Sequence, residues 1–319
     1  MVGELEWQPA TASALGAWAD ALEASEAVDR SGEVIRREDL EEQLALSYVD
    51  AARDTRLGWI GEQVVAYGIV WSIPSKRQRR VMLGGGIVPE CRGEGIGTEL
   101  IGWLIERGLE VAAAGEPGTP GWLELFASEH DVDRESLFAA LGFTPLRYYF
   151  QMRRPLAPDL PSPDGAAGFT LVPYDFGLDD AVRRAHNEAF RDHFASTEFD
   201  AETWQFLVTD RHFRADASFV VLDGDEVVGY ALNSIYPDEW EALGYSEGWT
   251  HQLGVRRPWR GRGIAKALLG ATAGAFAREG LGYATLDVDA ENPTGALALY
   301  EGSGYTRART RVAWSRPVD

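Results

Sequence analysis

The sequence predicts a duplicated α+β fold, in which two tandem domains each form a mixed sheet flanked by helices. Two observations predict it. The segments Val64–Gly68 and Val227–Ala231 resemble each other 163 residues apart, and Gly142-Phe143 and Gly304-Tyr305 do so 162 residues apart. In each copy, stretches with strand alternation and stretches with helical spacing follow the order β-α-α-β-β-β-α-β-α-β. That mixture is typical of an α+β domain.

The second copy shows its elements most clearly. Phe219–Leu222 and Val227–Tyr230 flank Asp223-Gly224, a strong signal for a hairpin. Ile264, Leu268, Ala271 and Ala275 recur at helical spacing. The pattern predicts further strands over 169–174, 249–255, 284–288 and through Trp314, and helices over 180–194, 201–208 and 294–301. The first copy repeats this order, with its second helix over 39–48.

A linker separates the copies. Residues 156–168 contain several prolines and glycines, which sustain neither a strand ladder nor a helix. The sequence therefore predicts a first domain over 1–155 and a second over 169–319.

Composition narrows the class of protein. The chain has 319 residues, which favours two domains, and a formal net charge of −20. That charge argues against binding to nucleic acid or to an anionic membrane. A single cysteine, Cys91, excludes an internal disulfide and a cysteine-rich metal site. No long apolar run or signal peptide is recognisable, so we expect a cytoplasmic protein.

One short glycine-rich sequence occurs twice, as Arg92-Gly-Glu-Gly-Ile-Gly97 and as Arg260-Gly-Arg-Gly-Ile-Ala265. Each copy follows a predicted strand and begins a predicted helix. Glycines there let successive backbone N–H groups converge at the positive end of the helix dipole, which predicts a phosphate or pyrophosphate site. A nucleotide-binding P-loop is absent. A dinucleotide fingerprint has different spacing and follows the first strand of its domain.

The pattern Arg-x-x-Gly-x-[Gly/Ala] resembles motif A of the GNAT superfamily of acyl-CoA-dependent N-acetyltransferases. A second motif of that family is matched downstream, where Asn292 precedes a helix that carries Tyr300, followed by Gly304-Tyr305. The resemblance covers nearly the whole chain, twice. The tandem arrangement is similar to that of mycothiol synthase-like proteins of the superfamily, although mycothiol chemistry is not inferred from it.

This resemblance implies acetyl-CoA as acyl donor, no metal, and direct transfer of the acetyl group to a primary amine of a small molecule. The backbone N–H of Val255 would polarise the thioester carbonyl, and Asn292 would cap the helix and meet the pantetheine arm. The loop residues implied to hold the pyrophosphate are Arg260, Gly261, Arg262, Gly263, Ile264 and Ala265. Their counterparts in the first half are Ile87, Arg92, Gly93, Gly95 and Gly97.

Proton-handling residues distinguish the halves. Tyr300 stands where the family has its thiolate-protonating tyrosine, and the first half has Phe138 at that place. His251, four residues before Val255, is a candidate base or water-holding residue, whereas Leu83 lies four residues before Ile87.

Two further differences point the same way. His130 replaces Asn292, and Glu94 replaces Arg262 near the expected phosphates. We therefore expect the second half to be catalytic, and the first to be a degenerate copy with a structural or acyl-CoA-binding role.

The acceptor site is expected along 190–194 and 236–241, whose acidic and aromatic residues suit a small cationic amine. A solvated loop and core aromatics explain them equally well. His186 and His193 have no third residue spaced for a metal. Lys76–Arg80 is a solvated hairpin edge or a contact to a cofactor phosphate, and Cys91 is a packing residue.

Two other functions stay open. One is a non-catalytic module that binds or senses acyl-CoA. The other is acylation of a protein amine, or transfer from aminoacyl-tRNA, which the net charge disfavours. The sequence does not specify the acceptor, the general base, the acyl-chain preference or the oligomeric state, although a duplicated domain is compatible with a monomer.

Overall fold

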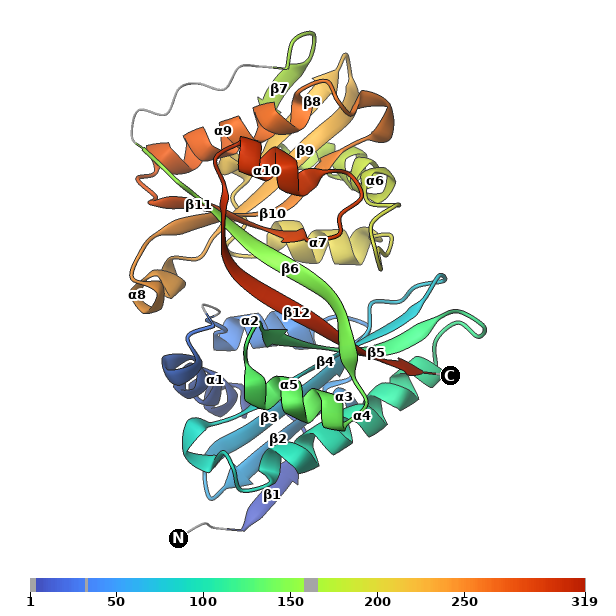
Figure 1. The fold of residues 1–319 in the computed structure, drawn as a ribbon, viewed down its shortest axis with the longest axis vertical. Helices are drawn as coiled ribbons and strands as arrows, with labels where there is room; N and C mark the ends of the chain where they lie inside the picture. Colours follow the sequence, from blue (N-terminus) through green and yellow to red (C-terminus); the bar gives the residue numbers. More distant parts are fainter. Residues whose placement is uncertain (1–3, 32–33, 158–165, 319) are drawn as a thin grey trace. The chain divides into compact units, whose positions relative to one another are not determined.

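The computed structural model describes residues 4–31, 34–157 and 166–318 (Figure 1). It divides into two compact units, one formed by residues 1–146 with 312–319 and the other by residues 147–311. Most of the expected linker, residues 158–165, lies outside the described residues.

The first unit contains a mixed sheet with strand order β1-β2-β3-β4-β5-β12. The pairs β1–β2, β2–β3 and β3–β4 are antiparallel, whereas β4 and β5 are parallel and joined by a helix. Its elements in chain order are β1 (Leu5–Gln8), α1 (Leu15–Asp29), α2 (Arg37–Leu44), α3 (Ala51–Asp54), β2 (Thr55–Ile60), β3 (Gln63–Trp71), β4 (Arg79–Ile87), α4 (Ile96–Ala113), β5 (Gly121–Ser128) and α5 (Val132–Ala140).

The second unit repeats this arrangement with strand order β6-β11-β10-β9-β8-β7. Here β10 and β11 are the parallel pair. The remaining elements in chain order, of which β6 and β12 contribute residues to both units, are β6 (Thr144–Pro155), β7 (Thr170–Pro173), α6 (Asp179–Ala189), α7 (Ala201–Thr209), β8 (Phe219–Asp223), β9 (Glu226–Ile235), α8 (Trp240–Leu243), β10 (Glu247–Val255), α9 (Ile264–Arg278), β11 (Tyr283–Asp289), α10 (Ala296–Gly302) and β12 (Thr306–Val318).

The last strand of each half completes the sheet of the other unit. From Arg147 onward β6 belongs to the second unit, where it pairs antiparallel with β11 from Tyr149 to Pro155. From Val312 onward β12 belongs to the first unit, where Trp314 packs in the core with Phe138. The compact units therefore differ from the linear halves 1–155 and 169–319. Alternation along the chain identifies a strand, but it does not identify the strand's partner.

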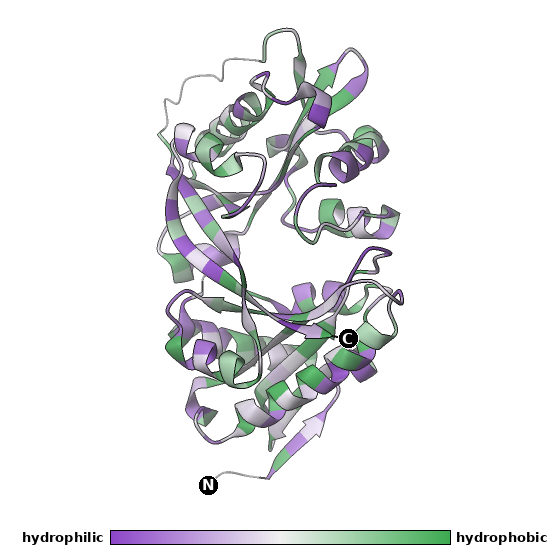
Figure 2. Ribbon diagram, turned by 45° about the vertical axis from the view of Figure 1, so that its right-hand side comes forward, coloured by the Kyte–Doolittle hydropathy of each residue, from purple (hydrophilic) through white to green (hydrophobic). Residues whose placement is uncertain are grey.

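Each sheet carries helices on both faces, because neighbouring strand residues point to opposite sides. In the first unit, Val70 packs with α4 and Ile69 packs with α1. In the second unit, Val221 packs with α9 and Val220 packs with α6 and α7. Figure 2 shows hydrophobic and hydrophilic residues alternating along α4, as expected of a helix with one buried face.

The predicted elements of the second half are present with shifted ends. The helix expected over 180–194 ends at Ala189, with Phe190 at its C-cap, and Ala195 has a left-handed φ of 52°, which a continuing α-helix excludes. The short helix α8 in the connection after β9 was not predicted. No described helix has the length and apolar character needed to cross a membrane.

Candidate active site

The two glycine loops have the same backbone conformation. Gly93 and Gly95 have φ of 79° and 87°, and Gly261 and Gly263 have φ of 78° and 81°. These left-handed values favour glycine. Gly95 and Gly263 each stand at the N-cap of a long helix, α4 or α9, whose first N–H groups have no partner within the helix. Both loops therefore offer N–H groups to an anion.

The arginine that begins each loop is a structural residue. Arg260 donates from Nε to the Val255 carbonyl at 3.0 Å and from Nη2 to the Ala189 carbonyl at 2.8 Å. Arg92 donates from Nε to the Ile87 carbonyl at 2.9 Å. These side chains tie the loop to the end of the preceding strand. Ile264 is buried in the core, so only its backbone can face a ligand, whereas the side chain of Arg262 is exposed.

The parallel strands separate before they end. Pairing of β10 with β11 stops at Thr250 and Leu286, which leaves residues 251–255 and 287–289 apart. We call these two segments the second-half opening. Pairing of β4 with β5 stops at Met82 and Glu124, so residues 83–87 and 125–128 form a first-half opening.

The N–H of Val255 points into the second-half opening. Arg256 donates its N–H to the Val228 carbonyl at 3.0 Å, so this pair is a hydrogen-bonded pair of β10 and β9. Bonded and non-bonded pairs alternate in an antiparallel ladder, so the N–H of Val255 faces away from β9. The same reasoning applies to Ile87, because Val88 donates its N–H to the Val65 carbonyl at 2.9 Å. Both halves thus have a backbone N–H in the opening, at the position where that of Val255 is expected to polarise the thioester carbonyl.

His251 is an extra residue in its strand. The register of β10 against β9 shifts between Thr250 and Gln252, which identifies a β-bulge at His251. The pairing of β4 with β3 has no such shift, and there Leu83 pairs with Val70 as Thr250 pairs with Asn233. The structural counterpart of Leu83 is therefore Thr250. The earlier equivalence with His251 is wrong, because counting along the chain overlooks an inserted residue.

The His251 ring lies among aromatic side chains. Its Nε2 is 2.8 Å from the hydroxyl of Tyr236, and its ring is parallel to that of Trp249, with centroids 5.8 Å apart. The residue is exposed to solvent, yet desolvation by the surrounding side chains lowers the pKa of its imidazole to about 4. Asp210 opposes this shift, and His212, whose ring lies 4.5 Å from that of Tyr236, adds to it. His251 is therefore neutral near pH 7.

Tyr300 is buried, with 8% of its surface exposed. It lies in α10, and burial raises the pKa of its hydroxyl to about 12. Its counterpart Phe138 is equally buried and packs its ring against Phe143 and Trp314. The two positions are alike in burial, and they differ by the hydroxyl.

Asn292 organises the loop before α10, but it does not cap the helix as predicted. Its Oδ1 accepts from the N–H of Thr294 at 2.9 Å and from the Thr294 hydroxyl at 2.6 Å, whereas the N-cap is Gly295. The helix therefore begins one turn later than an asparagine cap would set it. In the first half, the corresponding loop residue His130 has a φ of 74°.

The sequence did not predict that Tyr230 and His186 form a buried pair. Tyr230 is fully buried, and its hydroxyl lies 2.7 Å from Nδ1 of His186. The Tyr230 ring also packs on Gly254, where an added Cβ would lie 2.5 Å from its Cε1. Tyr67 packs in the same way on Gly86. The repeated Val-Val-x-Tyr segment was the available signal, since it places one tyrosine beneath the end of each strand.

Because His186 is buried, it should make stability depend on pH. Desolvation lowers the pKa of its imidazole to about 4, so the folded chain resists a proton that the unfolded chain binds below pH ~6.5. The unfolding free energy should fall as the pH decreases through that window, by about 3 kcal/mol at most. Urea unfolding at pH 7, 5.5 and 4.5 would measure this. His186→Gln should flatten the slope, whereas the exposed His130→Asn should not; equal slopes in both variants would contradict it.

Most side chains of the expected acceptor segments, 190–194 and 236–241, make contacts within the fold. Phe190 packs on His186, Asp192 pairs with Arg257, and Trp240 donates its indole N–H to the Glu247 carbonyl at 3.3 Å. Of the segment 236–241, Tyr236 is the residue in contact with His251. Tyr236 and His251 form a cluster with Trp249 and with residues 210–212, which the sequence did not predict as part of the acceptor site.

The remaining candidates are structural. His186 is bonded to Tyr230, and no group of potential metal ligands occurs among the described residues. Arg79 donates to the Thr119 carbonyl, and Arg80 pairs with the buried Glu124. Desolvation, with Glu94 and Glu90 nearby, raises the pKa of the Cys91 thiol, which disfavours the nucleophilic thiolate.

Comparison with known proteins agrees with this geometry. Residues 180–305 match the model of the acetyltransferase (GNAT) family. The chain is 31% identical over 243 residues to a mycothiol acetyltransferase from Geodermatophilus obscurus, covering 72% of each chain.

Two solved structures share the fold. A GCN5-related N-acetyltransferase from Sphaerobacter thermophilus matches with a TM-score of 0.76 and 24% identity, over 98% of this chain and 95% of that one. A tandem GNAT protein from the clavulanic acid biosynthesis pathway matches with a TM-score of 0.71 and 16% identity, over 98% of both chains. With its two glycine loops and separated strands, this chain belongs to the GNAT family and is an N-acetyltransferase that uses acetyl-CoA as acyl donor.

Proposed function

We propose that the second half transfers the acetyl group of acetyl-CoA directly to a primary amine of a small molecule. One observation carries this assignment: the bulged His251, the N–H of Val255 and the hydroxyl of Tyr300 all belong to the second half, whereas the first half has a counterpart only of the N–H. The acceptor is bound near the aromatic cluster of Tyr236, Trp249 and His212.

The loop 260–265 and the start of α9 hold the pyrophosphate through backbone N–H groups. Arg262 and Lys266, both exposed, add positive charge there, where the first half has Glu94 and Thr98. The pantetheine arm then lies in the second-half opening, beside Asn292. This places the thioester carbonyl against the N–H of Val255, which stabilises the developing oxyanion by about 3 kcal/mol.

An amine that arrives as a cation first loses one proton to solvent, because only the neutral nitrogen has a lone pair to attack with. The neutral nitrogen then forms a bond to the carbonyl carbon, the carbon–sulfur bond breaks, and the nitrogen loses a second proton. His251, with its pKa of about 4, is too weak a base to keep that proton. Its neutral ring instead accepts a hydrogen bond from the amine or from a water that carries the proton to solvent.

Tyr300 donates a hydrogen bond to the departing sulfur. With a pKa of about 12, it is a weaker acid than a thiol of pKa about 8.5, so complete transfer would cost about 5 kcal/mol. The thiolate is therefore stabilised by the hydroxyl and takes its proton from solvent.

Acidic and aromatic groups near His251 suit an amine that arrives as a cation. Asp210 lies close enough to affect the His251 imidazole, and the Tyr236 and Trp249 rings can contact a cation through their faces. Because a matching relative is named mycothiol acetyltransferase, a mycothiol-related amine belongs in the panel of acceptors.

The test is release of free thiol from acetyl-CoA with a panel of primary amines. We expect turnover with at least one small amine, and at least a tenfold loss of kcat/KM for acetyl-CoA in Arg262→Glu/Lys266→Glu. The first-half control Glu94→Lys should change kcat/KM less than twofold. Tight CoA binding without thiol release with any amine would favour the non-catalytic binding module, and release with peptide amines alone would favour a protein substrate.

A further inference from the structure

We propose that an ion-pair cluster of Asp29, Arg92 and Arg134 closes the first-half opening, so that the chain binds one acyl-CoA, in the second half. This inference rests on the proposed function of the second half, and it goes further by assigning a reason why the first half takes no cofactor.

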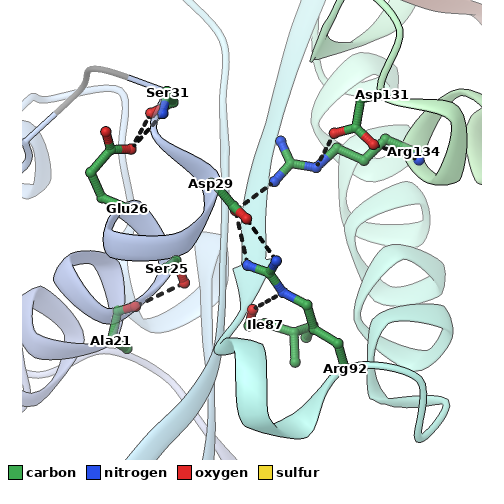
Figure 3. A network of polar contacts seen from close by, with 9 residues as sticks. All are labelled: Ala21, Ser25, Glu26, Asp29, Ser31, Ile87, Arg92, Asp131 and Arg134. Carbon is green, nitrogen blue, oxygen red and sulfur yellow. Dashed lines mark hydrogen bonds and ion pairs between the residues drawn. The ribbon is translucent and has the colours of Figure 1, made fainter. Parts of the chain in front are cut away.

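The cluster is centred on one carboxylate. Arg92 donates to Asp29 through both terminal nitrogens, at 2.6 and 2.9 Å, and Arg134 donates to the same carboxylate at 3.2 Å. Asp131 in turn lies 3.3 Å from Nε of Arg134. Figure 3 shows the Asp29 carboxylate between the two guanidinium groups.

These residues join elements on both sides of the opening. Asp29 is the last residue of α1, and Arg92 also holds the carbonyl of Ile87, the last residue of β4. Arg134 comes from α5, which begins four residues after the end of β5. The cluster thus links the end of β4 to the helix that follows β5. The pantetheine arm would have to pass between these same elements.

The loop arginine of the second half is bound differently. Arg260 binds the backbone carbonyl of Ala189, the last residue of α6. The residue corresponding to Arg134, at the 162-residue spacing that relates Phe138 to Tyr300, is Ala296. An alanine therefore stands where the first half has Arg134, and the loop arginine binds backbone carbonyls where Arg92 binds a carboxylate.

Charge also works against an anionic ligand in the first half. Asp29 already accepts hydrogen bonds from Arg92 and Arg134, so these N–H groups are not offered to a phosphate. Glu94 adds an exposed negative charge to the loop. Acyl-CoA phosphates approaching this loop would meet like charges. In the second half, Arg262 and Lys266 stand near the same position of the loop and attract them.

Isolated surface ion pairs contribute little, but this cluster differs from them in two respects. The Arg92 contact is bidentate, which fixes its geometry, and Asp29 is shared by two arginines while only 24% of its side chain is exposed. Opening the cluster would leave two guanidinium groups and one carboxylate to find new partners together.

The test is titration of CoA into the full chain by calorimetry. The wild type should bind one CoA per chain, and Arg262→Glu/Lys266→Glu should lose at least tenfold in affinity. In that background, Asp29→Ala/Glu94→Arg/Arg134→Ala should regain a site for one CoA per chain. The matched control Glu94→Arg, in the same background with Asp29 and Arg134 intact, should regain none.

Binding of two CoA molecules by the wild type would overturn the proposal, as would undiminished binding in Arg262→Glu/Lys266→Glu. So would a regained site in the Glu94→Arg control, or a failure of the opened variant to bind when circular dichroism shows it folded. Failure of the proposed function has a separate signature, which is the absence of thiol release by the wild type with every amine.

Discussion

Replacing Tyr300 by phenylalanine should lower kcat about 100-fold and leave the KM for acetyl-CoA nearly unchanged. The substitution removes one oxygen from a side chain that is 92% buried, so packing around α10 is preserved. What is lost is the hydrogen bond to the departing sulfur, an interaction formed only as the carbon–sulfur bond breaks. Removing such an interaction lowers kcat rather than weakening substrate binding.

The first half supplies the matched control. Phe138→Tyr adds a hydroxyl at the corresponding buried position, and it should leave kcat unchanged because the proposed mechanism places catalysis in the second half. It should cost some stability, since the new hydroxyl has to find a partner among Phe143 and Trp314. Steady-state thiol release by both variants, with the melting temperature measured alongside, tests whether kcat depends on the hydroxyl of Tyr300. Full turnover by Tyr300→Phe would remove Tyr300 from the mechanism.

Much of this site could be predicted from the sequence because its signals are local. The glycine loops are recognisable because glycines stand where a left-handed backbone is needed, and Gly304 follows Tyr300 by four residues, just past the end of α10. Such features depend on a few consecutive residues. Helix ends were predicted less accurately, because the helical pattern of the sequence continues to residue 194 whereas α6 ends at Ala189.

Features made by distant residues could not be predicted. Asp29, Arg92 and Arg134 meet only because α1, a loop and α5 converge at one end of a sheet. The bulge at His251 can be recognised only from the pairing of β10 with β9. The sequence of β10 alone is compatible with a strand that contains the extra residue and with one that does not. The sequence likewise does not show that β6 and β12 each join the sheet of the other unit, because a strand's pattern does not identify its partner.

The two halves show how a duplicated fold can divide its roles. Both retain the glycine conformation, the arginine that ties the loop to its strand, and a tyrosine packed on the strand's last glycine. These shared features shape the end of the parallel strand and do no chemistry by themselves. On the proposed mechanism, proton handling and cofactor access rest on additions to this scaffold, which are the bulged histidine and Tyr300 in one half and the Asp29 cluster in the other.

Replacing Gly254 by alanine should have the second large effect on turnover, because Gly254 lies between the buried Tyr230 and the proposed oxyanion donor, the N–H of Val255. A Cβ at Gly254 would lie 2.5 Å from Cε1 and 2.6 Å from the hydroxyl of Tyr230. Tyr230 is fully buried and bonded to His186, so it cannot move aside easily. Gly254→Ala should therefore push β10 outward and displace the N–H of Val255, lowering kcat about 100-fold or more.

The control is Gly86→Ala in the first half, where the added Cβ would meet the Tyr67 hydroxyl at 2.4 Å and its Cζ at 2.7 Å. Both variants crowd a tyrosine ring at the end of a strand, which typically costs about 1–3 kcal/mol of stability, although Tyr67 is half-buried where Tyr230 is fully buried. We expect similar losses of unfolding free energy in denaturant but a loss of turnover in Gly254→Ala alone. If Gly86→Ala lowered kcat as much while the chain remained folded, the end of β4 would be part of the catalytic machinery. If Gly254→Ala kept full activity, the N–H of Val255 would not be the oxyanion donor.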